Sequence, residues 1–86
     1  MNMNSYCITF RSVTPAQKGE NLLRKFGYRC SLQRTPRWME EKGCGYCLRT
    51  QTDRLEEVTG LLRKNGVDYR KAYQFQADGG IQEIRL

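Results

Sequence analysis

The chain has 86 residues. A chain of this size buries only about 60–65% of its unfolded surface, so we expect one domain with a modest core and little room for an enclosed cavity. Hydrophobic residues make up 38% and charged residues 28%, which argues against intrinsic disorder. The net charge of +6 permits contact with nucleic acid or an acidic partner. Because the basic residues are spread along the chain, we favour a solvated basic surface.

Residues 1–5 carry no basic segment followed by an apolar run, so we expect no secretory signal. No apolar stretch approaches the ~20 residues that span a bilayer, and we expect no membrane contact. The sequence therefore predicts a cytoplasmic protein, in which thiols stay reduced. Its four cysteines are then core residues or reactive groups rather than a disulfide framework.

The first half of the chain predicts a strand, a helix and a strand. Alternation over residues 6–10 indicates a strand with Tyr6, Ile8 and Phe10 on one side. A helix follows that we expect Thr14 to cap, and Gly27 ends it. Residues 28–33 form the second predicted strand, with Tyr28, Cys30 and Leu32 directed inward.

The second half repeats this order after a polar loop over residues 34–43. Residues 44–50 predict a third strand, and a helix follows that we expect Thr52 or Asp53 to cap and Gly66 to end. Residues 67–76 predict a long fourth strand. Residues 77–80 predict a hairpin turn, and residues 81–86 either a short edge strand or a tail.

Two such repeats predict an α+β domain of the ferredoxin-like βαββαβ plan. It is a two-layer sandwich with a four-stranded antiparallel sheet and two helices on one face. The whole chain, residues 1–86, forms one domain, with the core in residues 5–76 and a hairpin or tail in residues 77–86. Right-handed crossovers place the first and third strands side by side at the centre.

The repeat separates the four cysteines into different environments. Cys7 and Cys47 occupy equivalent positions, and side-chain alternation places both on the open face of the sheet. Cys30 is expected to be a small core residue. Cys44 has no counterpart in the first half and lies where the polar loop enters a strand, so we expect it to be accessible and to carry chemistry.

A cysteine reacts as its thiolate, and nearby cations lower the thiol pKa from its usual value of about 8.5. The candidate cations around Cys44 are Arg37, Lys42 and Arg49, and Gly45 leaves one side of the sulfur unshielded. Four interpretations stay open for Cys44 and Cys47: a metal site, a dithiol redox centre, a carrier thiol, or inert part-buried cysteines. The absence of histidine and of a second close cysteine pair argues against zinc, and no metal or cofactor is expected.

Two further interpretations concern partners. An RNA-binding module of this fold stacks bases on aromatics of the open face, but alternation directs Tyr6, Phe10 and Tyr46 toward the helices, which makes nucleic acid an unfavoured partner. An open sheet face could also pair in a homodimeric regulatory module. Trp38 beside Pro36 in the polar loop is a candidate docking anchor for a partner, or it folds back over the core.

The sequence resembles a family of small bacterial proteins described as selenium/sulfur carriers, formerly a domain of unknown function. The resemblance covers roughly residues 5 to 75 and rests on Ile8-Thr9-Phe10, Pro36-Arg37, Cys44-Gly45 and Leu48-Arg49. In that family the cysteine before the glycine is the proposed carrier, which corresponds to Cys44. Cys47 departs from the pattern, where a small residue such as alanine is expected; it is either a replacement or a second thiol that resolves a persulfide on Cys44.

The resemblance implies a carrier protein rather than a stand-alone enzyme. Cys44 would accept a persulfide or perselenide group from a donor enzyme, such as a desulfurase or a selenocysteine lyase, and pass it to an acceptor protein. This exchange requires only an exposed thiolate and a docking surface, which a small domain without a pocket can provide.

Overall fold

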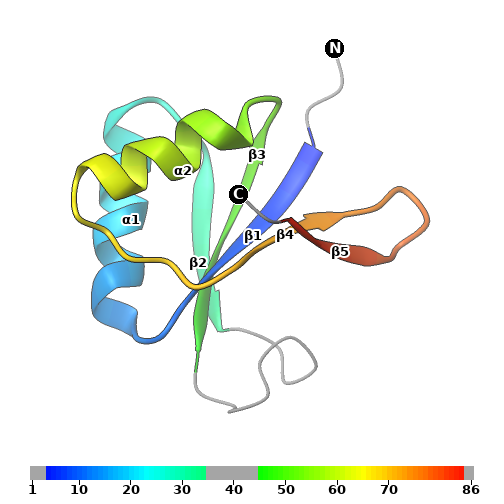
Figure 1. The fold of residues 1–86 in the computed structure, drawn as a ribbon, viewed down its shortest axis with the longest axis horizontal. Coiled ribbons are helices and arrows are strands. Elements are labelled where there is room, and N and C mark those ends of the chain that lie inside the picture. Colours follow the sequence, from blue (N-terminus) through cyan, green and yellow to red (C-terminus); the bar gives the residue numbers. More distant parts are fainter. Residues whose placement is uncertain (1–3, 35–44, 85–86) are drawn as a thin grey trace.

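The computed structural model describes residues 4–34 and 45–84, and it shows an α+β protein with two helices and one five-stranded antiparallel sheet (Figure 1). In chain order the elements are β1 (Asn4–Phe10), α1 (Val13–Lys25), β2 (Cys30–Arg34), β3 (Tyr46–Thr52), α2 (Leu55–Lys64), β4 (Ala72–Phe75) and β5 (Ile81–Ile84). The order of the predicted elements along the chain is therefore confirmed.

The strands lie in the order β2-β3-β1-β4-β5, so β1 is central and pairs with β3 on one side and β4 on the other. The predicted adjacency of the first and third strands is confirmed. The sheet has five strands rather than four, because residues 81–84 pair with β4. They form the short edge strand that the sequence analysis gave as the alternative to a tail. The two strands join through a turn in which Gly79 takes a positive φ of 90°.

The predicted fourth strand is too long at its start, since β4 begins only at Ala72. Before it, residues 67–71 pass from α2 to the sheet as an irregular segment. Two backbone hydrogen bonds join this segment to β1, from Arg70 N–H to the Thr9 carbonyl (2.7 Å) and from Thr9 N–H to the Lys71 carbonyl (2.8 Å). The Thr9 hydroxyl also accepts a hydrogen bond from the Lys71 N–H at 3.1 Å. Hydrogen bonds at 70 and 71 therefore guide the chain to β1 before regular pairing begins.

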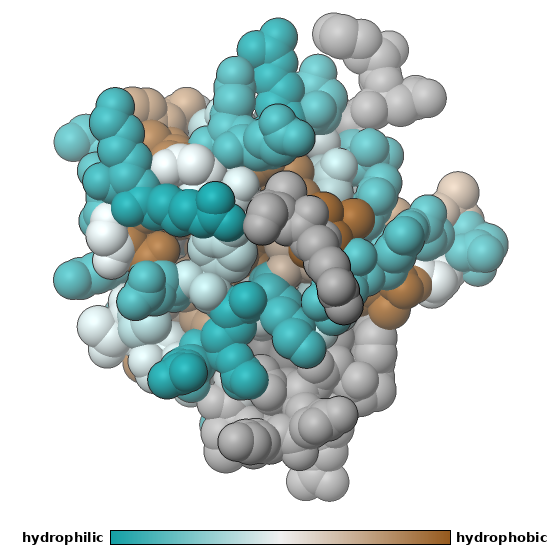
Figure 2. All heavy atoms as spheres, in the orientation of Figure 1, coloured by the Kyte–Doolittle hydropathy of each residue, from teal (hydrophilic) through white to brown (hydrophobic). Residues whose placement is uncertain are grey.

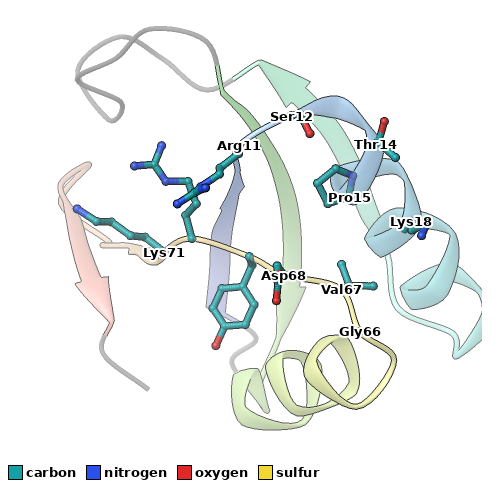
Figure 3. A pocket seen from close by; sticks show the side chains of 11 residues that line it. Arg11, Ser12, Thr14, Pro15, Lys18, Gly66, Val67, Asp68 and Lys71 are labelled. Atoms are coloured by element: carbon teal, nitrogen blue, oxygen red, sulfur yellow. The ribbon is translucent and has the colours of Figure 1, made fainter.

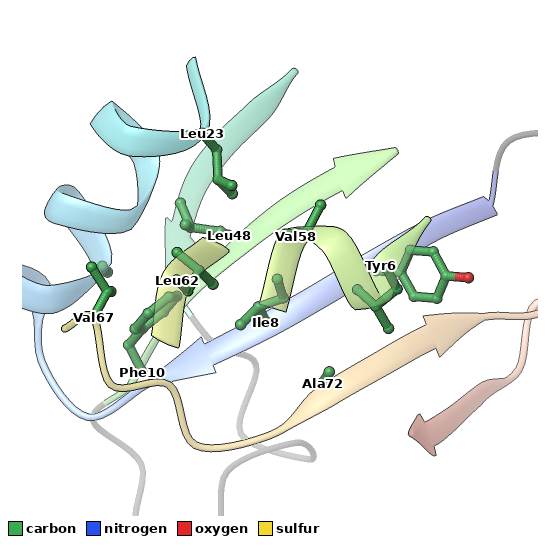
Figure 4. Close-up of a cluster of buried hydrophobic side chains, with 11 residues drawn as sticks. Tyr6, Ile8, Phe10, Leu23, Leu48, Val58, Leu62, Val67 and Ala72 are labelled. Carbon is green, nitrogen blue, oxygen red and sulfur yellow. The ribbon is translucent and has the colours of Figure 1, made fainter. Parts of the chain in front are cut away.

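Both helices pack on one face of the sheet, which we call the helix face (Figures 1 and 4). Ile8 and Phe10 of β1 meet Leu23 of α1 and Leu62 of α2 there, and all four are fully buried. Alternation along β1 directs Cys7 and Thr9 to the other side of the sheet, the opposite face. The view in Figure 2 shows a largely hydrophilic exterior, and no helix among the described residues is long and apolar enough to cross a bilayer.

The sequence predicted where the two helices end better than where they begin. Gly27 and Gly66 follow the helices with φ of 87° and 73°, as the predicted stops require. The predicted starts are wrong. Ser12 precedes α1 and Arg54 precedes α2, and neither makes a side-chain capping hydrogen bond. Thr52 instead accepts a hydrogen bond from the Arg54 backbone N–H at 3.0 Å, so it shapes the turn before α2.

Candidate functional site

The structure describes only part of the predicted site. Gly45, Cys47 and Arg49 lie within the described residues. The predicted carrier residue and most of its predicted companions lie outside them: Pro36, Arg37, Trp38, Lys42 and Cys44. Gly45, which follows the carrier residue in the sequence, is buried and immediately precedes β3. Because Tyr46 pairs with Phe10, this start of β3 lies beside the end of β1.

Cys7 and Cys47 form a thiol pair on the opposite face. They belong to neighbouring strands, and their register is diagonal, because Cys7 pairs with Arg49 and Thr9 pairs with Cys47. A hydrogen bond joins the two thiols. The sequence placed both on the correct face but wrongly expected that face to be open at these positions, since Cys7 is 1% and Cys47 is 2% exposed.

The Cys7 thiol holds its proton firmly. The hydrogen bond with Cys47 and the burial of the side chain both raise the pKa of the Cys7 thiol, and Cys47 adds an electrostatic contribution of the same sign. The Arg49 guanidinium lowers this pKa by a smaller amount. Cys7 is therefore a protonated thiol at neutral pH, with little nucleophilic character.

No described helix lies on this face, and Arg49 and Phe75 make a side-chain contact across the strand that carries Cys7. The Arg49 guanidinium lies over the Phe75 ring, 4.4 Å from its centroid. Arg49 is on β3 and Phe75 on β4, so the contact crosses β1, which lies between these strands. Cys7 pairs with Arg49 on one side and with Tyr73 on the other, and is thus enclosed by large side chains of both neighbouring strands.

The sequence analysis missed the aromatic residues on the opposite face. Tyr73 faces the same side as Cys7, its pairing partner, and Phe75 follows it by two positions. The alternation in residues 72–75 was the available signal, since Ala72 belongs to the core cluster and its neighbour must face away. Phe75 is half-buried and one face of its ring is in contact with Arg49, so this pair is a packing contact.

Cys30 lies in a third environment, on the edge strand β2. It is half-buried and packs against the core, which agrees with the prediction that Cys30 faces inward. Its thiol donates a hydrogen bond to the Glu20 carbonyl at 3.6 Å. Burial and the nearby Glu20 carboxylate raise the pKa of the Cys30 thiol, although Arg24 opposes the shift. Within residues 4–34 and 45–84, no three cysteine, aspartate or glutamate side chains gather as a metal site would require.

Two helices on one side of an antiparallel sheet, with cysteines on the two central strands, define a small α+β domain that carries thiols. A family model described as "Putative Se/S carrier protein-like" matches residues 5–74, and the chain belongs to this family. The match spans the first four strands and both helices and stops before β5. Comparison with curated proteins and with solved structures found no match.

Proposed function

We propose that this protein carries sulfur or selenium as a persulfide or perselenide on Cys44. The observation that carries the proposal is the family match over residues 5–74. In this proposal the first four strands and two helices serve as a ferredoxin-like support, and β5 is an addition to it. A donor enzyme and an acceptor protein in the cytoplasm are the partners that such a role requires.

The environments of the other cysteines support the choice of Cys44. A carrier residue must be reachable by a partner's sulfur and must ionise near neutral pH. Cys7 and Cys47 are almost completely buried, and the pKa of Cys7 is raised. Cys30 is half-buried with a raised pKa. None of these described thiols meets both requirements, so we assign the exchange to the remaining cysteine.

The proposed exchange needs no oxidant or reductant. The Cys44 thiolate attacks the terminal sulfur of a donor persulfide, a bond forms between the Cys44 sulfur and that atom, and the donor's S–S bond breaks. The donor cysteine leaves as a thiolate, and Cys44 now holds the persulfide. An acceptor thiolate repeats the exchange and releases the Cys44 thiolate. Selenium follows the same steps with a perselenide.

The remaining predicted residues have narrower roles in this proposal. Arg37 and Lys42 would stabilise the Cys44 thiolate, and Pro36 with Trp38 would contribute to partner docking. The described contact of Arg49 is with Phe75, and its described electrostatic effect is to lower the pKa of Cys7. Cys47 is buried beside Cys7, so a resolving role for Cys47 would require the side chains that cover it to move first.

The test is transfer of a labelled atom. The protein is incubated with a cysteine desulfurase that has been loaded from ³⁵S-cysteine, then separated without reductant and digested for mass spectrometry. We expect one added sulfur on the peptide that contains Cys44, and its loss on treatment with dithiothreitol. Cys44→Ser should abolish labelling, because serine cannot form the new S–S bond.

Cys30→Ser is the matched control, since Cys30 is the one thiol among the described residues that is only partly buried. It should be labelled like the unaltered protein. Retention of the label in Cys44→Ser would remove Cys44 from the mechanism. The same experiment with selenocysteine and a selenocysteine lyase determines which of the two elements is carried.

A further inference from the structure

A basic cleft lies beside the start of α1, and nothing in the carrier proposal uses it. Its volume is about 690 Å³, within the range of roughly 300–1,000 Å³ found for small-molecule sites. One wall is the connection from β1 to α1 with the first turns of that helix, and the other is the segment 66–71 between α2 and β4 (Figure 3). Residues from distant parts of the chain therefore form the cleft.

The charge of the lining is strongly positive. Arg11, Lys18, Arg70 and Lys71 line the cleft, and Asp68 is the acidic residue among the lining side chains. Figure 3 shows that three of these cations come from different elements: Arg11 follows β1, Lys18 lies on α1 and Lys71 precedes β4. A concave surface of one sign concentrates counter-ions more effectively than the same charges on a flat surface.

Two of these charges, those of Arg11 and Lys18, are available to a ligand, and a third is only weakly paired. Lys71 lies 3.7 Å from Glu83, but both side chains are about half exposed, so solvent weakens this pair. In the part of the chain that the structure describes, Arg11 and Lys18 have no ion-pair partner. Both are exposed and can turn toward a ligand in the cleft.

The helix end in the wall adds to this potential. The first turn of α1 contains no acidic residue, and no side chain caps it, so the positive end of the helix dipole is not compensated there. By contrast, α2 carries Glu56 and Glu57 in its first turn. The α1 end supports the site, although the cations of three elements define it.

The cleft also has a less polar part, which is lined by Val67, Pro15 and Tyr69. Tyr69 is held in place by Arg63, which donates a hydrogen bond to its hydroxyl at 2.6 Å and whose guanidinium lies 5.5 Å from the ring centroid. The cleft therefore combines a cationic region with a fixed aromatic side chain. This is the arrangement expected for a ligand that has an anionic end and an organic body.

We propose that this basic cleft binds a phosphorylated small molecule and that the phosphate is the recognised group. One arginine guanidinium group can donate hydrogen bonds to two oxygens of the same phosphate. Arg11 and Arg70 both line the cleft. A phosphate with two negative charges also satisfies more of the four cations than a single carboxylate does. The proposal is independent of thiol chemistry at Cys44.

The test is an NMR titration of the ¹⁵N-labelled protein with sodium pyrophosphate and with ADP, at constant ionic strength. We expect amide shifts to concentrate in residues 11–18 and 66–71, with saturation, for both probes. The double variant Arg11→Gln/Lys18→Gln should weaken binding by about tenfold or more, since a charge-assisted hydrogen bond contributes enough for that change.

The matched control is Lys25→Gln/Arg29→Gln, which removes the same two residue types and the same charge at exposed positions at and just beyond the other end of α1. It should leave the affinity within about twofold, because exposed charges more than a Debye length of about 10 Å apart are screened. Cys44→Ser should bind normally. Shifts spread over the whole basic surface, equal weakening by both double variants, or no saturable binding would overturn the proposal.

Discussion

The two faces of the sheet bury their residues by different means. On the helix face, Ile8 and Phe10 are covered by two helices that supply a continuous apolar layer. On the opposite face, Cys7 is as buried as these residues, yet side chains from neighbouring strands cover it, among them Arg49 over Phe75. Similar burial therefore arises from close packing on one face and from a few long side chains on the other.

This difference shows what burial means for a thiol. A residue covered by helices is exposed only when tertiary structure opens, whereas a residue beneath Arg49 can be exposed when one side chain moves. The predictions below therefore compare tight packing on the helix face with the thinner cover over the thiol pair.

The largest effect is expected where the helix face has no spare room. A methyl group on Gly19 of α1 would lie 3.0 Å from Leu48 Cδ1 and 3.3 Å from both Leu62 Cδ2 and Phe10 Cζ. These partners are fully buried and cannot withdraw. We expect Gly19→Ala to lower the free energy of unfolding by about 1–2 kcal/mol, despite alanine's better helix propensity.

Gly60→Ala is the matched substitution in α2. A methyl group there meets nothing within 4 Å, so the gain in helix propensity should raise the free energy of unfolding by about 0.5–1 kcal/mol. Urea unfolding measures both. Equal effects of the two substitutions would contradict close packing around Gly19.

The second effect is on the pH dependence of stability, where the raised pKa of Cys7 should change the free energy of unfolding by at most about 1.4 kcal/mol per pH unit. The folded state raises the pKa of Cys7, so this thiol stays protonated when the unfolded chain begins to lose the proton. The stabilisation is complete below the unfolded pKa of about 8.5 and declines as the pH rises above it. We expect urea unfolding between pH 7.5 and 10 to show this decline.

Cys7→Ala isolates the contribution of Cys7, because Tyr28 and Cys30 also have raised pKa values and remain in both proteins. The variant should lose stability less steeply with pH than the unaltered protein. Parallel profiles would show that Cys7 ionises equally well in the folded and unfolded states.

The smallest effect on stability is expected from removing the cover itself. Arg49→Ala abolishes the contact with Phe75 and should lower the free energy of unfolding by about 0.5–1 kcal/mol, as expected for a partly exposed cation–π pair. The effect of Arg49→Ala on the accessibility of the two thiols should be larger than its effect on stability. We expect alkylation of Cys7 and Cys47 to become several times faster, measured by mass spectrometry of the digested protein.

Arg34→Ala is the control, since Arg34 also lies over an aromatic ring, that of Tyr46 at 6.0 Å. This ring points to the helix face, and the substitution should leave the alkylation rates unchanged. If Arg49→Ala also left them unchanged, the cover over the thiol pair would have to come from other residues.

The repeat and the alternation of side chains predicted the element order, the adjacency of β1 and β3, and the face of the three described cysteines. Such patterns depend on the geometry of strands and helices, which the local sequence determines. The capping predictions failed because Thr14 and Asp53 fit a capping pattern, while the turns before α1 and α2 start the helices elsewhere. Alternation also cannot predict how exposed a residue is, since Arg49 reaches across β1 to cover Cys7.

The candidate site could be predicted only in part. The choice of Cys44 stays a prediction, because this residue lies outside the described residues. The three described cysteines lie in strands and are wholly or partly buried. The basic cleft was invisible to sequence reasoning, because its cations lie at 11, 18, 70 and 71 and form no run. The four cations come together because the β1–α1 connection and the segment before β4 line the same cleft.

The fifth strand has a consequence for how the protein behaves at high concentration. By pairing with β4, residues 81–84 occupy backbone groups that would otherwise form the border of the sheet. An unshielded border recruits the same strand of another molecule and starts edge-to-edge aggregation. The border on this side is instead β5, a strand of four residues that carries the charged Glu83, and short edge strands with charged side chains are poor templates for pairing with another copy.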